Sequence, residues 1–409
     1  MTRATVTVRM YNVGFGDCFL VTIPDGKAVR RILIDCGTHP ASTGPRSASD
    51  AAKQILADLS KDGATPRIDV VVATHRHRDH VSGFRDQELW SKVEVGEVWL
   101  PWTEDPKNPA AVRLLERMSG VAFALDAARG LMQAAPAVSL ASALIENSLA
   151  NEAPMETLHQ GFAGTPRRRF LSAGSDVSDA PLGKVGVHVL GPSTDEKVIR
   201  TLEPPKDQSW MTIADDDSAA TVERRAFDEG WAIGLDEFRA TKAFQELYPD
   251  DAILNAIKRV AADEILFGAA QLEKAVNGTS LVLVIEVGDL LLLFPGDAQW
   301  GTWQTILDDA KMRSLVQRAT FYKIGHHGSH NATPQSFVKD VLAPNVWAAL
   351  PFARVQIWPN IPHPDLLAAL TDKKARIFRS DEPPAVAIPN VTVRENISID
   401  LSFHSHATR

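Results

Sequence analysis

The stretch VVATHRHRDHVSGF, residues 71–84, concentrates side chains that bind metal ions. His75, His77, Asp79 and His80 follow directly after an apolar run that is typical of a buried strand. In an extended segment residues i and i+2 point the same way, so His75 and His77 can aim at one point. After the chain turns, Asp79 and His80 can address a second point nearby. Imidazole and carboxylate ligands suit zinc, and also manganese or iron, so the stretch predicts a metal site rather than a solvated polar loop.

The spacing HxHxDH resembles the signature of the metallo-β-lactamase superfamily, and further stretches resemble other motifs of that family in the family's order. LIDCG resembles the motif in which a carboxylate, here Asp35, orients the histidine loop from behind. LLLFPGDA resembles the motif whose aspartate, here Asp297, bridges two metal ions. YKIGHHGSH resembles the motif that supplies a histidine ligand at a strand end. The resemblance implies two zinc ions, or manganese in their place, held by His75, His77, Asp79, His80, Asp297 and His326.

The two histidines of GHHGSH cannot both be ligands in an extended segment, because adjacent side chains face opposite ways. We favour His326 as the ligand, because it directly follows the strand FYKIG. His327 is then a catalytic residue together with Asp79, which would also orient the nucleophile. With Ser329 and His330, His327 could hydrogen-bond a substrate oxyanion. A solvated loop position is the simpler interpretation of His330.

The third-motif histidine, which completes the first metal site in the superfamily, has no evident counterpart, because no GH(T/S) loop is present. His188 lies inside the strand VHVLGPS, where a packed or surface histidine is the commoner case, and His159 lies in the loop LHQGF. Both are candidates. Without them the first site consists of His75, His77, Asp297 and water molecules, and is more open.

The elements around these motifs predict how the chain is organised. Alternating and apolar segments predict strands in residues 1–104, with an amphipathic helix at 47–63. Helical patterns prevail in residues 105–275, apart from one core strand near 184–192, and strands return in 276–409. With the resemblance, this order predicts a four-layer αββα metallo-β-lactamase sandwich, built from the first and third segments and interrupted by a mostly helical insertion.

The stretch PMETLHQGFAGTPRRRF, residues 154–170, is rich in turn formers and predicts a linker within the insertion. Its three arginines, residues 167–169, could meet phosphates, but a short charge run is usually a solvated face.

The composition is that of an ordinary soluble protein, with 44% hydrophobic and 23% charged residues. The most apolar stretch, SLVLVIEVGDLLLLF, contains Glu286 and Asp289, so no membrane span is expected. Two cysteines provide no disulfide framework, and a cytoplasmic protein is the simplest interpretation. The net charge of −8 argues against a generally basic surface for nucleic acid, although it leaves a local basic groove open.

Three stretches narrow the resemblance. YNVGFGDCFLV, VNGTSLVLVIEVGDLLLLFPGDA and GHHGSH are similar to the lactamase-like domain of DNA-internalization competence proteins. That branch implies hydrolysis of DNA or another phosphodiester. We therefore predict a metal-dependent hydrolase that uses a metal-bound hydroxide on a phosphodiester, either nucleic acid or a small molecule.

Two other functions stay open, because the fold alone does not fix the substrate. An ester or lactone hydrolase would have an apolar pocket lined from the insertion by residues such as Trp210, Trp231 and Phe238. A subunit of a multi-protein system would bind a protein partner through the helical insertion.

Overall fold

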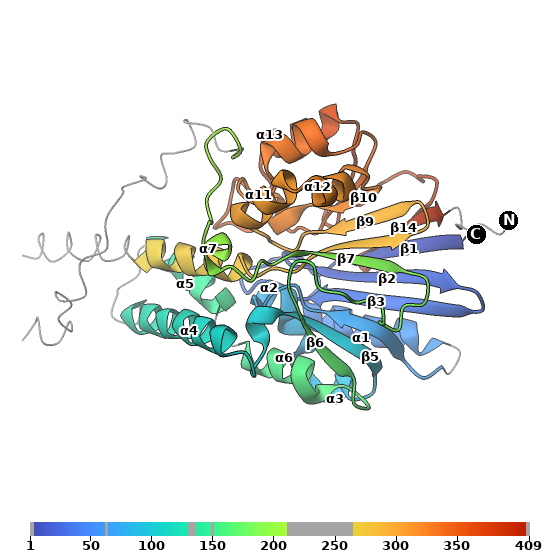
Figure 1. Ribbon diagram of the computed structural model, residues 1–409, viewed down its shortest axis with the longest axis horizontal. Helices are drawn as coiled ribbons and strands as arrows, with labels where there is room; N and C mark the ends of the chain where they lie inside the picture. The colour runs from blue at the N-terminus through green and yellow to red at the C-terminus, as the bar shows by residue number, and fades with distance from the viewer. Residues whose placement is uncertain (1–3, 62–63, 130–135, 149–150, 211–264, 406–409) are drawn as a thin grey trace, which may run out of the picture.

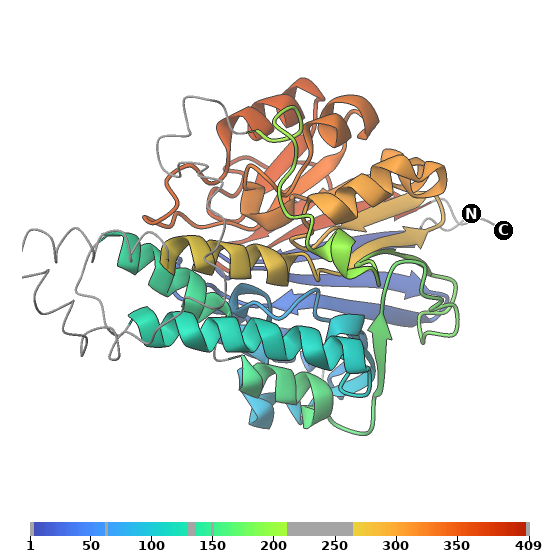
Figure 2. The ribbon, with the colours of Figure 1, turned by 60° about the vertical axis from the view of Figure 1, so that its left-hand side comes forward.

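The computed structural model describes residues 4–61, 64–129, 136–148, 151–210 and 265–405. Two β-sheets lie face to face, and helices cover the outer face of each sheet (Figure 1 and Figure 2). The predicted four-layer αββα sandwich is therefore confirmed. No helix in these ranges combines the length and the apolar character that crossing a membrane requires.

The first sheet has eight strands in the order β13-β14-β1-β2-β3-β4-β5-β6. Neighbouring strands are antiparallel from β13 to β3 and parallel from β3 to β6. The parallel part places the carboxyl ends of β3, β4 and β5 at one edge, where ligand sites of α/β proteins form. The strands are β1 (Ala4–Tyr11), β2 (Cys18–Asp25), β3 (Ala28–Cys36), β4 (Arg67–Val72), β5 (Glu94–Pro101), β6 (Arg167–Leu171), β13 (Val391–Arg394) and β14 (Ser398–Ser405).

The second sheet has six strands in the order β12-β11-β10-β9-β8-β7. β7, β8 and β9 are antiparallel, whereas β9 to β12 run parallel. The carboxyl ends of β9 and β10 therefore meet at one edge of this sheet as well. The strands are β7 (Gly186–Gly191), β8 (Val282–Val287), β9 (Leu290–Phe294), β10 (Phe321–Lys323), β11 (Trp347–Leu350) and β12 (Arg376–Arg379).

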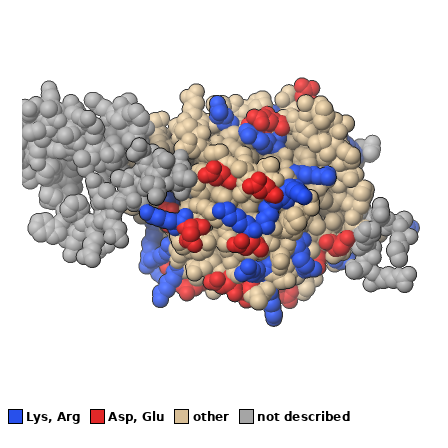
Figure 3. Space-filling model, turned by 90° about the horizontal axis from the view of Figure 1, so that it is seen from above, with Lys and Arg blue, Asp and Glu red and all other residues tan. Residues whose placement is uncertain are grey.

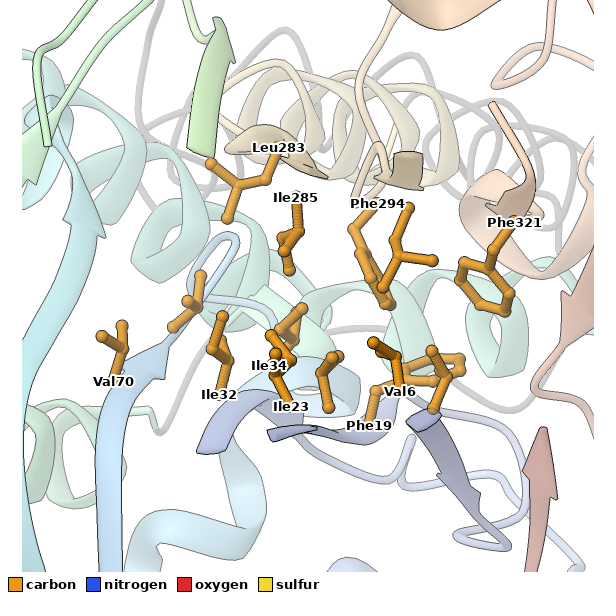
Figure 4. Close-up of a cluster of buried hydrophobic side chains, with 14 of the residues drawn as sticks. Val6, Phe19, Ile23, Ile32, Ile34, Val70, Leu283, Ile285, Phe294 and Phe321 are labelled. Atoms are coloured by element: carbon orange, nitrogen blue, oxygen red, sulfur yellow. The ribbon is translucent and has the colours of Figure 1, made fainter. Parts of the chain in front are cut away.

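Apolar side chains from the facing sides of the two sheets fill the space between them (Figure 4). Phe19 and Phe294, one from each sheet, meet edge to face with ring centroids 5.6 Å apart. Because side chains alternate along a strand, Ile34 belongs to this inner core while Val71 packs on the outer side with Ile55 of the covering helix. Full burial of each such side chain stabilises the fold by roughly 1.5–3 kcal/mol.

Helix α1 (Ala48–Leu59) covers the outer face of the first sheet and begins with a reciprocal cap. The Ser47 hydroxyl accepts a hydrogen bond from Asp50 N, and the Asp50 carboxylate accepts one from Ser47 N. Short helices α3 (Gln87–Trp90) and α6 (Glu152–Glu156) lie on the same side. The second sheet is covered by α11 (Trp300–Asp308), α12 (Ala310–Gln317) and α13 (Pro364–Asp372).

The insertion between β5 and β8 places its helices at one end of the sandwich (Figure 1). They are α4 (Pro109–Arg129), α5 (Pro136–Ser148), α7 (Glu196–Ile199) and a helix over residues 265–277. The 265–277 helix packs closely on α4, since a Cβ added to Gly268 would lie 2.9 Å from Leu125 Cδ2. Figure 2 shows these two helices side by side. The strand expected near 184–192 is present as β7.

The stretch predicted as a linker with solvated arginines is partly wrong, because residues 167–171 form the edge strand β6. Arg169 is only 8% exposed, and its guanidinium binds the Glu97 carboxylate at 2.7 and 3.0 Å. Glu97 lies on the neighbouring strand β5 and is itself buried. Arg169 therefore forms a bidentate ion pair within the sheet and is not part of a solvated or phosphate-binding face.

A cluster of charged groups ties α1 to the first sheet at Asp58, whose side chain is 5% exposed. Asp58 Oδ2 accepts hydrogen bonds from Arg9 Nη1 at 2.7 Å, Arg394 Nη1 at 2.7 Å and the Tyr11 hydroxyl at 3.1 Å. Burial alone would raise the pKa of Asp58, but Arg394 and Arg9 lower it below the usual value. The contact joins α1 to β1 and β13.

We expect Asp58→Ala to destabilise the protein by roughly 2–4 kcal/mol at neutral pH, because Arg394 loses its buried partner and Arg9 keeps only Asp400. Since the folded-state pKa is lowered, this contribution is present above about pH 3.9 and is lost as the pH falls through the folded value. Urea unfolding at several pH values measures it. Lys61→Ala is the control, because Lys61 is 66% exposed and lies 3.6 Å from Asp58; its effect should stay within about 0.5 kcal/mol.

Candidate metal centre

The histidine loop lies between β4 and the short helix α2 (Arg78–Val81). His75 and His77 precede the helix, whereas Asp79 and His80 lie in its first turn, and all four are at most 3% exposed. The backbone of this turn packs against the loop before β2 and the end of β3. A Cβ added to Gly37 would lie 2.2 Å from the Asp79 carbonyl carbon, so only glycine fits there.

His75 and His77 form the first group of candidate ligands. Their Nε2 and Nδ1 atoms, respectively, lie 3.1 Å apart. Two nitrogens bound to one zinc ion at about 2.0–2.1 Å are separated by roughly 3.3 Å in tetrahedral geometry, so the pair fits a shared ion. The other ring nitrogens meet hydroxyls, His75 Nδ1 at 3.2 Å from Ser280 Oγ and His77 Nε2 at 3.3 Å from Ser148 Oγ. Burial lowers the pKa of both imidazoles, which favours the neutral, ligating form.

The second group comprises Asp79, His80, Asp297 and His327, each offering one ligand atom, and these atoms all lie within 4.8 Å of one another. His80 Nε2 is 3.1 Å from Asp297 Oδ2, and His327 Nε2 is 3.3 Å from Asp79 Oδ2. Asp79 Oδ1 is buried without a hydrogen-bond partner among the described residues. Two imidazoles and two carboxylates in this arrangement suit a divalent cation such as zinc or manganese.

The partners of His80 and His327 fix which ring nitrogen of each histidine faces the second ligand group. His80 Nδ1 contacts Asp35 Oδ2 at 2.8 Å, and His327 Nδ1 donates to the Pro351 carbonyl oxygen at 2.9 Å. Asp35 also accepts hydrogen bonds from the backbone and hydroxyl of Thr74, both at 2.7 Å. Both imidazoles therefore present Nε2 to the ligand group, the usual arrangement behind a metal-binding histidine.

Lys323, a residue that the sequence analysis did not single out, lies within the centre and is 1% exposed. Its ammonium is 2.6 Å from Asp17 Oδ2 and 3.0 Å from Asp297 Oδ1. Although burial opposes it, these two carboxylates raise the pKa of Lys323 above its usual value. One oxygen of Asp297 thus pairs with lysine and the other faces the ligand group. The sequence offered one signal for Lys323, namely a charged residue inside the apolar strand FYKIG.

The loop after β10 brings His327, and not His326, into the ligand group. Both residues have positive φ angles, 44° for His326 and 51° for His327. The prediction for His326 assumed an extended segment, and this left-handed turn does not obey strand alternation. His326 instead places Nε2 at 3.3 Å from the Glu273 carboxylate on the 265–277 helix, and its Nδ1 is buried without a hydrogen-bond partner.

The remaining candidates are outside both groups. His188 on β7 binds Glu286 at 2.8 Å, and the ring of His159 stacks on Phe170 with centroids 5.9 Å apart. Ser329 donates to Asn331 Oδ1 at 2.8 Å, and burial lowers the pKa of His330 to about 4. No third histidine thus joins His75 and His77 from the described residues.

The aromatic residues predicted to line an ester or lactone pocket do not line one in the described part of the chain. Trp210 is 3% exposed, packs in the apolar cluster on the outer side of the second sheet, and donates its indole N–H to the Thr333 carbonyl at 2.5 Å. Trp231 and Phe238 lie outside the described residues.

The helical insertion contributes side chains directly beside the centre. Asn147 Oδ1, at the end of α5, accepts a hydrogen bond from Asp79 N at 3.2 Å, and the neighbouring Ser148 contacts His77. Glu273, on the 265–277 helix, contacts His326, which precedes the candidate ligand His327. No motif in the sequence indicated these residues, because their roles arise only when the helices pack over the loop.

Comparison with known proteins finds a similarity over the part of the chain that carries the histidine loop. Residues 11–110 match the family model of the Metallo-beta-lactamase superfamily. The matched region contains Asp35 and the whole histidine loop, whereas Asp297 and His327 follow it along the chain. The match and the His/Asp groups together indicate a metal-dependent hydrolase of this superfamily's kind. No curated protein matches the chain.

We expect His327→Ala to weaken metal binding by at least about 100-fold, because it removes one of four clustered ligands, whereas His326→Ala changes the affinity by less than about 5-fold. Elemental analysis after dialysis and competition with a chelator measure both variants. An equal loss in the two variants, or a larger loss in His326→Ala, would contradict the assignment of His327.

We expect Lys323→Met to destabilise the metal-free protein by about 3–5 kcal/mol, because Asp17 and Asp297 lose the buried ammonium that pairs with both of them. The loss should be smaller with saturating zinc, since the cation partly neutralises Asp297 and binds only the folded state. Urea unfolding with zinc and with chelator measures the difference. Lys311→Met, at an exposed position of α12, is the control and should have an effect within about 0.5 kcal/mol in both conditions.

Proposed function

We propose that the protein is a metal-dependent phosphodiesterase that acts on small phosphodiesters. The observation that carries the proposal is the pair of neighbouring ligand groups, His75 with His77 and the four-residue group around Asp297. Divalent ions held there would activate a water molecule and neutralise charge on the phosphate oxygens. The similarity of GHHGSH and its flanking stretches to the lactamase-like domain of competence proteins supports a phosphodiester.

Asp79 and His326 each have a second polar atom that has no hydrogen-bond partner among the described residues. Asp79 faces His327 through Oδ2, and its buried Oδ1 is available to accept a hydrogen bond from the attacking water. His326 is held by Glu273 through Nε2, and its Nδ1 is available to donate to the leaving-group oxygen. In this proposal His327 binds metal and His326 takes the role of donor.

The charge of the protein argues for a small substrate over a long duplex. On the face formed by α11, α12 and α13, basic and acidic side chains are interspersed (Figure 3). A protein that binds a duplex along its backbone needs several phosphate contacts from clustered Lys and Arg, and this outer side of the second sheet offers no such cluster. The net charge of −8 points the same way.

We expect the metal-loaded protein to hydrolyse bis(p-nitrophenyl) phosphate, and His77→Ala to lower kcat/KM by roughly 100-fold or more, because a ligand is lost. His188→Ala is the matched control and should stay within about 2-fold, since His188 is bound to Glu286 on a partly exposed strand.

A panel of single- and double-stranded DNA, a lactone and a β-lactam tests the alternatives. Cleavage of the lactone without any phosphodiester would replace the proposal by an ester or lactone hydrolase. Activity that appears only after a second protein is added would favour a partner-controlled subunit. Protein that retains no metal after dialysis would refute the metal centre itself.

A further inference from the structure

Asn277, the last residue of the 265–277 helix, carries a buried amide. The residue is 0% exposed, and neither its Oδ1 nor its Nδ2 has a hydrogen-bond partner among the described residues. Buried polar groups are nearly always paired, because an unpaired group loses its hydration and gains no hydrogen bond in return. A buried amide with both atoms unpaired therefore indicates that something binds there, such as a water molecule or an ion.

The helix turns the face that carries Asn277 toward the metal centre. Glu273 lies one turn before Asn277 on the same face, because residues i and i+4 are neighbours on a helix. The Glu273 carboxylate lies 3.3 Å from His326 Nε2. Burial lowers the pKa of His77, and the carboxylates of Asp79 and Glu273 oppose this shift. Both observations put this face of the helix beside the first ligand group.

The turn after Asn277 carries the chain to the other side of the same group. Ser280 N donates to the Asn277 carbonyl oxygen at 3.0 Å, so the two residues belong to one turn. Ser280 Oγ lies 3.2 Å from His75 Nδ1 and accepts a hydrogen bond from Asp297 N at 3.1 Å. Along the chain, Asn277 thus stands between a helix turn beside His77 and a residue that contacts His75.

The strand next to β8 offers no competing side chain. β7 ends at Gly191, opposite Val282 at the start of β8, so the two strand ends share one edge of the second sheet. A Cβ added to Gly191 would lie 2.7 Å from Thr302 Cγ2, so a side chain at this strand end would clash. Asn277, which precedes β8, reaches this edge without a rival from the end of β7.

We propose that Asn277 Oδ1 is a ligand of the ion at His75 and His77, in the role that no third histidine fills. Only the amide oxygen can accept a cation, so Nδ2 remains a donor beside the ion. Imidazole suits zinc, whereas carbonyl oxygen suits manganese, so this site should prefer Zn²⁺ over Mn²⁺ less strongly than a site of three imidazoles. The inference rests on the metal centre of the proposed function, but not on its substrate.

Competition with a chelator, measured on the full-length protein with Mn²⁺ and with Zn²⁺, tests the assignment. Asn277→Leu removes the oxygen at similar volume and should weaken binding at the first ligand group by at least about 10-fold. Asn277→Asp keeps an oxygen in place and should retain the wild-type affinity. Asn277→His should raise the preference for Zn²⁺ over Mn²⁺ by at least about 10-fold, because it supplies a third imidazole.

Thr279→Val is the matched control, because Thr279 lies in the same turn, is 3% exposed and donates to the Val276 carbonyl oxygen at 2.6 Å. It should change both affinities by less than about 2-fold. Thermal unfolding gives a second readout. Without metal, Asn277→Leu should unfold at no lower temperature than the wild type, since leucine removes an unpaired buried amide. With metal it should unfold at a lower temperature than the wild type, because weaker binding stabilises the folded state less.

The outcomes separate the ligand from the proposed function. Unchanged metal affinities in folded Asn277→Leu would overturn the ligand, even if bis(p-nitrophenyl) phosphate is hydrolysed. Equal losses in Asn277→Leu and Thr279→Val would overturn it as well, since they would reflect a disturbed turn. A loss confined to Asn277→Leu and restored by Asn277→Asp, in a protein that hydrolyses no phosphodiester, would support the ligand and refute the phosphodiesterase.

Discussion

His80 lies among four buried carboxylates, and the metal centre is organised around this arrangement. The carboxylates belong to Asp35, Asp297, Asp17 and Asp79, whose oxygens lie 2.8, 3.1, 3.7 and 4.0 Å from the ring nitrogens of His80. Burying that much like charge is unfavourable unless cations accompany it. Burial opposes protonation of His80, yet the surrounding acids raise its pKa well above the usual value. Lys323 supplies a second positive charge, and a divalent ion would supply the rest.

The sequence carried enough information for the parts of this centre that sit at strand ends. The histidine loop follows β4, Asp35 lies in β3 and Asp297 follows β9, so the hydrophobic pattern that predicts strands also locates them. Which of His326 and His327 joins the ligand group depended on a left-handed backbone that no sequence pattern predicts. The linker prediction at residues 167–170 missed β6, because the partner that makes Arg169 a sheet residue is Glu97, which lies 72 positions earlier in the chain on β5.

The insertion contributes both to the two sheets and to the surroundings of the metal centre. It supplies the edge strands β6 and β7 of the two sheets, and its helices supply Asn147, Ser148 and Glu273 to the centre. These contacts hold the two loops that carry the ligands. The geometry of the ligand loop therefore depends on packed helices of the insertion. Sequence patterns could identify the helices, but not the side chains that they bring to the loop, since helix packing decides that.

The pairing of β1 with β14 has a consequence for the order of folding. Ala4 lies opposite Ser405, and the contact between Asp79 and His327 spans 248 positions, so the sheet and the second ligand group close only through very distant segments. Contacts of this kind form slowly, and a chain leaving the ribosome at about 5–20 residues per second exposes its first half long before the second half arrives. Until then Asp17 lacks its partner Lys323, and Asp79 and His80 lack the two other members of the second ligand group, Asp297 and His327. The second ligand group is therefore complete only late in synthesis, after His327 has been added to the chain.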